Sequence, residues 1–86
     1  MKEIKFFTAT WCGACKSIGP HIRALEEDGT LKVGYIDIDE EKVVTKQHGV
    51  RRIPTLYYER GNVLVGYHTK DEILTWIKGL PNEEDL

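Results

Sequence analysis

The segment TWCGACK, Thr10–Lys16, holds both cysteines of the chain, three positions apart. A short apolar run ends just before this segment, and from Cys12 onward the apolar residues follow the period of a helix. At this spacing two thiols face each other across less than one helical turn. They can therefore form a disulfide, or open it again, without a large movement of the backbone.

The overall composition is that of one globular domain. The 86 residues are too few for two hydrophobic cores. A content of 41% hydrophobic and 30% charged residues argues against disorder. Twelve basic and fourteen acidic residues are interspersed, for a net charge of −2, which favours neither nucleic acid nor an anionic membrane as a partner. We therefore expect a single, monomeric domain over 1–86 that ends in an acidic tail at 82–86.

The cellular setting is inferred from the N-terminal pattern and the cysteine content. Residues 1–7 alternate like a strand and contain no apolar core of the length that a signal peptide requires. No apolar run reaches the ~18 residues of a membrane-spanning helix. In a reducing compartment two cysteines three apart are more often catalytic or metal-binding than structural. We therefore expect a cytoplasmic protein that does not bind membranes.

Hydrophobic periodicity and turn residues predict seven elements. They are a strand over 2–8, a helix over 12–27, a strand over 31–38, a helix over 40–48, strands over 55–59 and 63–67, and a helix between the capping box Thr69–Glu72 and Pro81. Thr10 is the predicted cap of the first helix and Asp39 of the second. The last two strands are predicted to form an antiparallel hairpin.

This order, βαβαββα, is that of an α/β fold. The first strand, helix and second strand form a right-handed βαβ unit, so the two strands are parallel. The hairpin then extends a four-stranded mixed sheet with helices on both faces. The cysteines follow the carboxyl end of the first strand, where α/β folds place their ligands.

The two thiols are expected to differ. Cys12, at the first helical position, faces the positive end of the helix dipole, which lowers the pKa of its thiol below the free value of about 8.5, and Lys16 adds a cation. Cys15 lies on the apolar stripe of the helix and is more buried. Cys12 is therefore the predicted exposed nucleophile, and Cys15 resolves the mixed disulfide. Gly13 allows close approach of a substrate backbone, and Trp11 offers an apolar surface beside Cys12.

A zinc half-site and a pair of inert thiols are the alternatives for these cysteines. A structural zinc site needs about four ligands. The histidines His21, His48 and His68 are scattered and lack the spacing of a zinc motif. We therefore expect no metal.

Two motifs, in the right order and spacing, resemble those of the thioredoxin family. The segment WCGACK is similar to its redox signature, with Ala14 where the family has proline, and Val50–Thr55 (VRRIPT) resembles its cis-proline loop. The resemblance covers residues 2 to about 80, and the family's first strand and helix have no counterpart in it. The other matching features are Pro20, Ile36–Asp39, Gly61 and Gly66.

The resemblance implies a thioredoxin-like fold and a role for each matched residue. Cys12 and Cys15 match the redox pair, a disulfide that an external reductase reduces, with no bound cofactor. Pro54 matches the cis-proline that packs against this disulfide, although the sequence alone favours trans, since only ~5–6% of such bonds are cis. The implied substrate-binding residues are Trp11, Gly13, Ala14, Ile53, Pro54 and Gly66.

Three positions depart from the family pattern. Phe6 stands where thioredoxins carry a buried aspartate that exchanges protons with the resolving cysteine. Tyr35 replaces the lysine paired with that aspartate, and Thr8 replaces a tryptophan. The proton acceptor for Cys15 is therefore open, and Ala14 leaves the redox potential open.

The predicted function is that of a thiol–disulfide oxidoreductase that reduces protein disulfides, with a thioredoxin reductase-like enzyme or glutathione as the electron donor. One alternative is a glutaredoxin-like, glutathione-dependent enzyme, which the short length and the stretch 66–71 favour and the Gly13-Ala14 dipeptide does not. The other is a redox-inactive docking module that binds through the surface around Trp11, Ile53 and Gly66.

Overall fold

The computed structural model describes residues 2–81, so the acidic tail predicted at 82–86 lies outside the described residues. The element order βαβαββα is confirmed, with a single 3₁₀ turn at Glu59–Gly61 inside the hairpin. The elements are β1 (Lys2–Thr8), α1 (Gly13–Glu27), β2 (Leu31–Asp37), α2 (Lys42–Gln47), β3 (Thr55–Tyr58), β4 (Asn62–Val65) and α3 (Lys70–Lys78).

The sheet has the strand order β2-β1-β3-β4, so β1 lies inside it. β1 runs parallel to β2, with Thr8 opposite Asp37, and antiparallel to β3, which pairs with β4 in an antiparallel hairpin. The predicted parallel pair and the predicted hairpin are both confirmed. Because β1 and β2 end at the same edge of the sheet, the loops that follow them lie side by side there.

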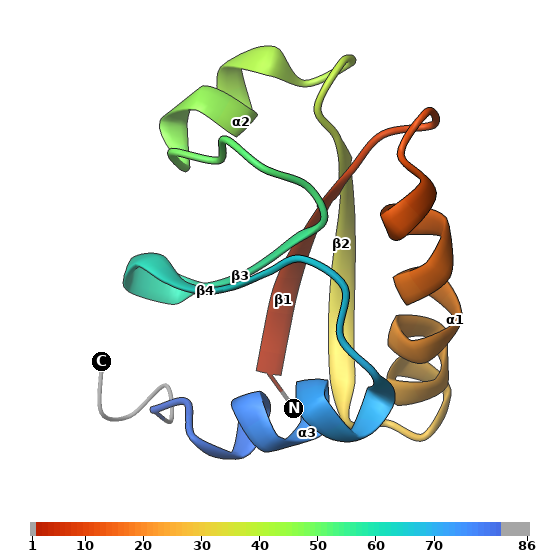
Figure 1. Cartoon of the computed structure of the whole chain (residues 1–86). Coiled ribbons are helices and arrows are strands. Elements are labelled where there is room, and N and C mark those ends of the chain that lie inside the picture. The colour runs from red at the N-terminus through yellow and green to blue at the C-terminus, as the bar shows by residue number, and fades with distance from the viewer. Residues whose placement is uncertain (1, 82–86) are drawn as a thin grey trace.

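Helices cover both faces of the sheet, as predicted. Figure 1 shows α1 and α3 against one face and α2 on the other. Ile4 and Phe6 of β1 belong to the hydrophobic core that contains the buried residues of α1 and α3. Phe7 points the other way, with its ring centroid 5.4 Å from that of His48 at the end of α2. Full burial of each such side chain contributes about 1.5–3 kcal/mol to folding.

The apolar stripe of α1 is where the period predicted it, but the start of the helix is not. The buried side chains are Cys15, Ile18, Ile22 and Leu25. The N-cap is Cys12, in extended conformation, and the helix begins at Gly13, so the predictions of Thr10 as the cap and of Cys12 as a helical residue are wrong. The Cys12 sulfur accepts the hydrogen bond that a capping oxygen usually accepts.

The second helix is shorter than predicted and is not capped by Asp39. α2 begins at Lys42 after Glu41, which makes no side-chain capping bond. Val43, a predicted apolar contact, is 69% exposed, whereas Val44 is half-buried. A six-residue helix presents only one or two positions to the sheet, so its periodicity is too weak to locate.

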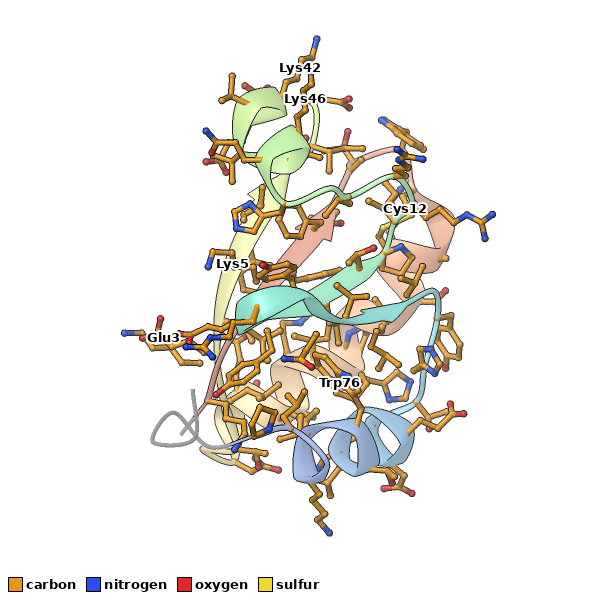
Figure 2. All side chains as sticks on the ribbon, turned by 90° about the vertical axis from the view of Figure 1, so that its left-hand side faces the viewer. Glu3, Lys5, Cys12, Lys42, Lys46 and Trp76 are labelled. Atoms are coloured by element: carbon orange, nitrogen blue, oxygen red, sulfur yellow. A yellow bond between two sulfur atoms is a disulfide. The ribbon has the colours of Figure 1, made fainter. Side chains whose placement is uncertain are left out.

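The C-terminal helix follows the prediction closely. Thr69 Oγ1 accepts from the N–H of Glu72 at 3.3 Å, and the Glu72 carboxylate accepts from the N–H of Thr69 at 2.9 Å. This reciprocal capping box opens α3. Ile73 and Ile77 are buried, and Figure 2 shows Trp76 between α3 and the sheet. The half-buried residues that pack against the core from this end of the chain are Leu74, Trp76 and Leu80.

Candidate redox site

Cys12 and Cys15 form a disulfide at the N-terminal end of α1, with their Cα atoms 5.2 Å apart. The pair follows directly on β1, at the edge of the sheet where the parallel strands end. Figure 2 shows Cys12 beside the loop that leads into β3. The fold thus brings the two predicted motifs to one place, although they lie about forty residues apart in the sequence.

The backbone around Cys12 holds its sulfur at the helix terminus. Cys12 Sγ accepts a hydrogen bond from the N–H of Cys15 at 3.2 Å, and the carbonyl of Cys12 accepts from the N–H of Lys16 at 3.2 Å. A further bond runs from the N–H of Cys12 to the carbonyl of Ala9. A thiolate formed by reduction at this N-cap gains from the N–H donor and from the helix dipole.

Both cysteines are buried, so the prediction of an exposed Cys12 is wrong. Cys12 is 7% exposed and Cys15 4%. As the N-cap, Cys12 turns its sulfur over the first turn toward the N–H of Cys15 rather than outward. Every other residue of the segment Thr10–Lys16 is exposed, including the neighbours Trp11, Gly13 and Ala14.

Trp11 is fixed on the surface by a residue that the sequence did not assign to the site. Its side chain is 64% exposed, and its Nε1–H donates to Asp39 Oδ2 at 2.7 Å. Asp39 follows β2, at the same edge of the sheet as the cysteines. The predicted parallel pairing of the first two strands could have placed these two residues together, because parallel strands that start together also end together.

The loop before β3 contains a cis peptide bond between Ile53 and Pro54. Pro54 is buried, and its carbonyl accepts a hydrogen bond from the N–H of Gly66 at 2.8 Å. Gly66 has φ +89°, which favours glycine at this position. Ile53 is half-buried. The cis form implied by the resemblance is confirmed, and the trans form that the sequence alone favours is wrong.

The three departures from the family pattern lie on the Cys15 side of the disulfide. The rings of Phe6 and Tyr35 pack edge to face, with centroids 5.7 Å apart. The Tyr35 hydroxyl donates to the Glu26 carboxylate, and burial, followed by this hydrogen bond, raises the pKa of Tyr35 to about 12. Phe6, Thr8 and Tyr35 share the wall of an open hollow of about 350 Å³ with Cys15.

The other side chains that line this hollow are basic or very small. They are Lys16, Gly19 and Arg23, all from α1. No carboxylate is among the described residues that line it. The neighbourhood of Cys15 therefore carries positive charge, whereas the family pattern has a buried aspartate there.

The three histidines lie in separate environments. His21 contacts Tyr67 and the N–H of Lys70, His48 packs against Phe7, and His68 contacts the carbonyl of Val65. Within residues 2–81, no three His, Cys, Asp or Glu side chains are arranged to hold a metal ion. Across the same residues, none of the helices has the length and apolar character needed to cross a membrane.

Comparison with known proteins finds similarity to thioredoxins along most of the chain. The family model described as Thioredoxin matches residues 4–79. A thioredoxin of Rickettsia felis is 34% identical over 77 residues, which cover 83% of this chain and 73% of that protein. A thioredoxin of Pseudomonas aeruginosa is 38% identical over 77 residues, which cover 83% of this chain and 71% of the relative.

Solved structures show the same likeness. A mutant thioredoxin from Halobacterium salinarum superimposes with a TM-score of 0.80 at 30% identity, over 92% of this chain and 77% of that one. Chloroplastic thioredoxin z gives a TM-score of 0.75 at 27% identity, over 91% and 76% of the two chains. With its paired Cys12 and Cys15, this chain belongs to the thioredoxin family and is a dithiol–disulfide oxidoreductase.

Proposed function

We propose that the chain reduces disulfides in partner proteins, with Cys12 as the nucleophile and Cys15 as the resolving thiol. The Cys12 thiolate attacks one sulfur of the substrate disulfide, and the other sulfur leaves as a thiolate that takes up a proton. Cys15 then attacks Cys12 Sγ, the Cys12–substrate bond breaks, and the second substrate thiolate is released. Two electrons have passed to the substrate, and the Cys12–Cys15 disulfide remains.

The observation that carries this assignment is the position of Cys12 Sγ as the N-cap of α1. Its sulfur accepts the N–H of Cys15 at 3.2 Å, whereas Cys15 itself lies inside the first turn of the helix, on its buried face. A helix N-terminus lowers the pKa of a cysteine thiol. Of the two thiols, Cys12 is therefore the better nucleophile at neutral pH.

The proposed substrate surface surrounds the disulfide. It consists of Trp11, Gly13, Ala14, Ile53, Pro54 and Gly66. Trp11 offers an exposed apolar ring whose orientation Asp39 fixes, and the exposed Gly13 and Ala14 leave the approach to Cys12 open. The hydrogen bond between Gly66 and Pro54 joins the two loops that form the rest of this surface.

The proposed partners are proteins with disulfides and a thioredoxin reductase-like enzyme that returns two electrons to the Cys12–Cys15 disulfide. Such a cycle operates in a reducing compartment, and we place it in the cytoplasm, as part of electron transport and redox homeostasis. The protein acts as a monomer. It uses no bound cofactor, because the disulfide itself carries the electrons.

The test is the reduction of insulin disulfides in two coupled systems. One contains thioredoxin reductase and NADPH, and the other contains glutathione, glutathione reductase and NADPH. We expect turnover with thioredoxin reductase, and we expect Cys15→Ser to accumulate a mixed disulfide with the substrate. Turnover with glutathione alone would instead establish the glutaredoxin-like alternative. If Cys12→Ser kept biological activity, the protein would be a docking module.

A further inference from the structure

The hollow beside Cys15 contains no carboxylate base from residues 2–81 for the second step of the proposed reaction, the attack of Cys15 on the mixed disulfide. Cys15 must be a thiolate to attack the mixed disulfide, yet Phe6 occupies the place of a carboxylate base. The hollow is open, and Cys15 is part of its wall. The titratable side chains that line it besides Cys15 are Lys16, Arg23 and Tyr35.

Gly19 leaves room for the guanidinium group of Arg23 at the wall of the hollow that Cys15 also lines. It lies inside α1, where glycine is less favourable than alanine. A Cβ at this position would lie 3.2 Å from Arg23 Nη1 and 3.6 Å from Nη2. The guanidinium group of Arg23 therefore lies back along the helix, over the backbone of Gly19. Gly19 is four positions, or about one helical turn, from Cys15.

No carboxylate of the described residues lies within ion-pair distance of Arg23. Among residues 2–81, neither Arg23 nor Lys16 forms an ion pair. Glu26, one turn after Arg23, accepts a hydrogen bond from the hydroxyl of Tyr35, which lines the hollow from β2. Tyr35 thus engages this carboxylate, which keeps its negative charge but does not line the hollow, whereas Arg23 and Lys16 do line it.

We propose that Arg23, seated over Gly19 and assisted by Lys16, stabilises the thiolate of Cys15 electrostatically and so takes the place of a buried base. This proposal rests on the resolving role proposed above for Cys15. The thiol proton passes to solvent at the open hollow, and the cations favour the anion that remains. The thiolate then attacks Cys12 Sγ, and the electron pair of the broken bond leaves with the substrate sulfur. Arg23 is a positioning residue, since it acts through Cys15 and does not touch the substrate.

The direct experiment measures the ionisation of Cys15 in a Cys12→Ser background by the ultraviolet absorbance of the thiolate as a function of pH. Arg23→Gln is expected to raise the midpoint by about half a unit to one unit. Gly19→Ala keeps the charge of Arg23 and requires its guanidinium group to move only slightly, so it should leave the midpoint nearly unchanged. The shift in Arg23→Gln should shrink in high salt, because the hollow is open to solvent.

Two controls separate this effect from folding and from net charge. Alanine is a better helix former than glycine, and the group that it would meet is the end of a flexible side chain, so Gly19→Ala should stay folded. Lys78→Gln, in the last turn of α3, removes one positive charge away from the hollow and should leave the midpoint unchanged. An unchanged midpoint in Arg23→Gln overturns the proposal, as does an equal shift in Lys78→Gln.

A kinetic readout with both cysteines present completes the test. In Arg23→Gln, resolution of the mixed disulfide at neutral pH should be about threefold to tenfold slower, which is the expected shift of the midpoint expressed as a rate. Raising the pH should restore it. A slowed resolution that pH does not restore contradicts the electrostatic role. If Cys15→Ser traps no mixed disulfide, the proposed function fails, whatever the midpoint of Cys15 is.

Discussion

The two cysteines of the disulfide have Cα atoms only 5.2 Å apart, but their surroundings differ. The hydrogen bonds of Cys12, at the N-terminus of α1, are with backbone groups, among them the N–H of Cys15 and the carbonyl of Ala9. Cys15 borders a hollow whose character comes from side chains, among them Phe6 and Arg23. Substitutions can therefore change the environment of Cys15 while the geometry that activates Cys12 is kept.

The largest effect on activity is expected from replacing each of the two cysteines, one at a time, by serine. Cys12→Ser should reduce insulin turnover to the uncatalysed background, because no nucleophile remains at the N-cap. Cys15→Ser should also stop multiple turnover but should still allow the first attack, and non-reducing electrophoresis detects the trapped mixed disulfide. Equal absence of mixed disulfide in both variants would contradict the division of roles.

The next largest effect is expected at Phe6, which is 3% exposed and forms part of the wall beside Cys15. Phe6→Asp removes apolar burial and places a carboxyl group in the core, so the free energy of unfolding should fall by about 3 kcal/mol or more. Phe6→Leu is the matched control and should lose about 1.5 kcal/mol or less. Urea unfolding measures both. Equal losses would show that the wall tolerates a carboxyl group.

A smaller effect is expected on the Cys12 side, at Asp39. Asp39→Ala removes the acceptor of the Trp11 indole, and an exposed hydrogen bond of this kind contributes about 0.5–1 kcal/mol. We expect KM for a protein substrate to rise by about twofold to fivefold with little change in kcat, which is that energy expressed as an affinity. Asp39→Asn keeps an acceptor oxygen and should restore most of the loss. A fall in kcat alone would mean that Asp39 acts on the chemistry rather than on the substrate surface.

The smallest effect is a pH dependence on the Cys15 side. Burial, and after it the hydrogen bond to Glu26, raises the pKa of Tyr35 to about 12 from 10.0. The folded state thus favours the neutral phenol, so this contribution to stability is complete below pH 10 and is lost as the pH rises toward 12. Because the ring is partly exposed, the loss amounts to a fraction of a kcal/mol. Urea unfolding across this range gives the free energies of unfolding of the parent protein and of Tyr35→Phe. The two values should converge as the pH rises, and a constant difference between them would contradict the assignment.

Local sequence signals predicted most of the fold. The apolar stripe of α1 and the capping box of α3 depend on neighbours within one or two turns, and both were located correctly. The start of α1 was placed wrongly because cysteine is not a usual capping residue, and only the structure shows its sulfur accepting the N–H of Cys15. The order of the strands across the sheet also depends on long-range packing, which periodicity does not report.

The candidate site was predicted only as far as its residues form motifs. The cysteine pair is visible in the sequence, and the family resemblance supplied the cis bond before Pro54. The bond between Trp11 and Asp39 and the seat of Arg23 over Gly19 are contacts chosen by the packing of this particular chain. Neither contact can be recognised in the sequence from one partner alone.

The capping role of Cys12 also couples folding to electron transfer. In the disulfide form Cys12 Sγ already accepts the N–H that completes the first turn of α1, and reduction turns this sulfur into a thiolate, which is a stronger acceptor. In a thermodynamic cycle, whatever the helix end contributes to the reduced form beyond its contribution to the disulfide form appears equally in the difference between their free energies of unfolding and in the reduction potential. An excess of ~1 kcal/mol for a thiolate at the helix end, with ~30 mV equal to ~1.4 kcal/mol, moves the potential upward by about 20 mV. The difference in stability between the reduced and the oxidised protein is thus a measure of its oxidising strength.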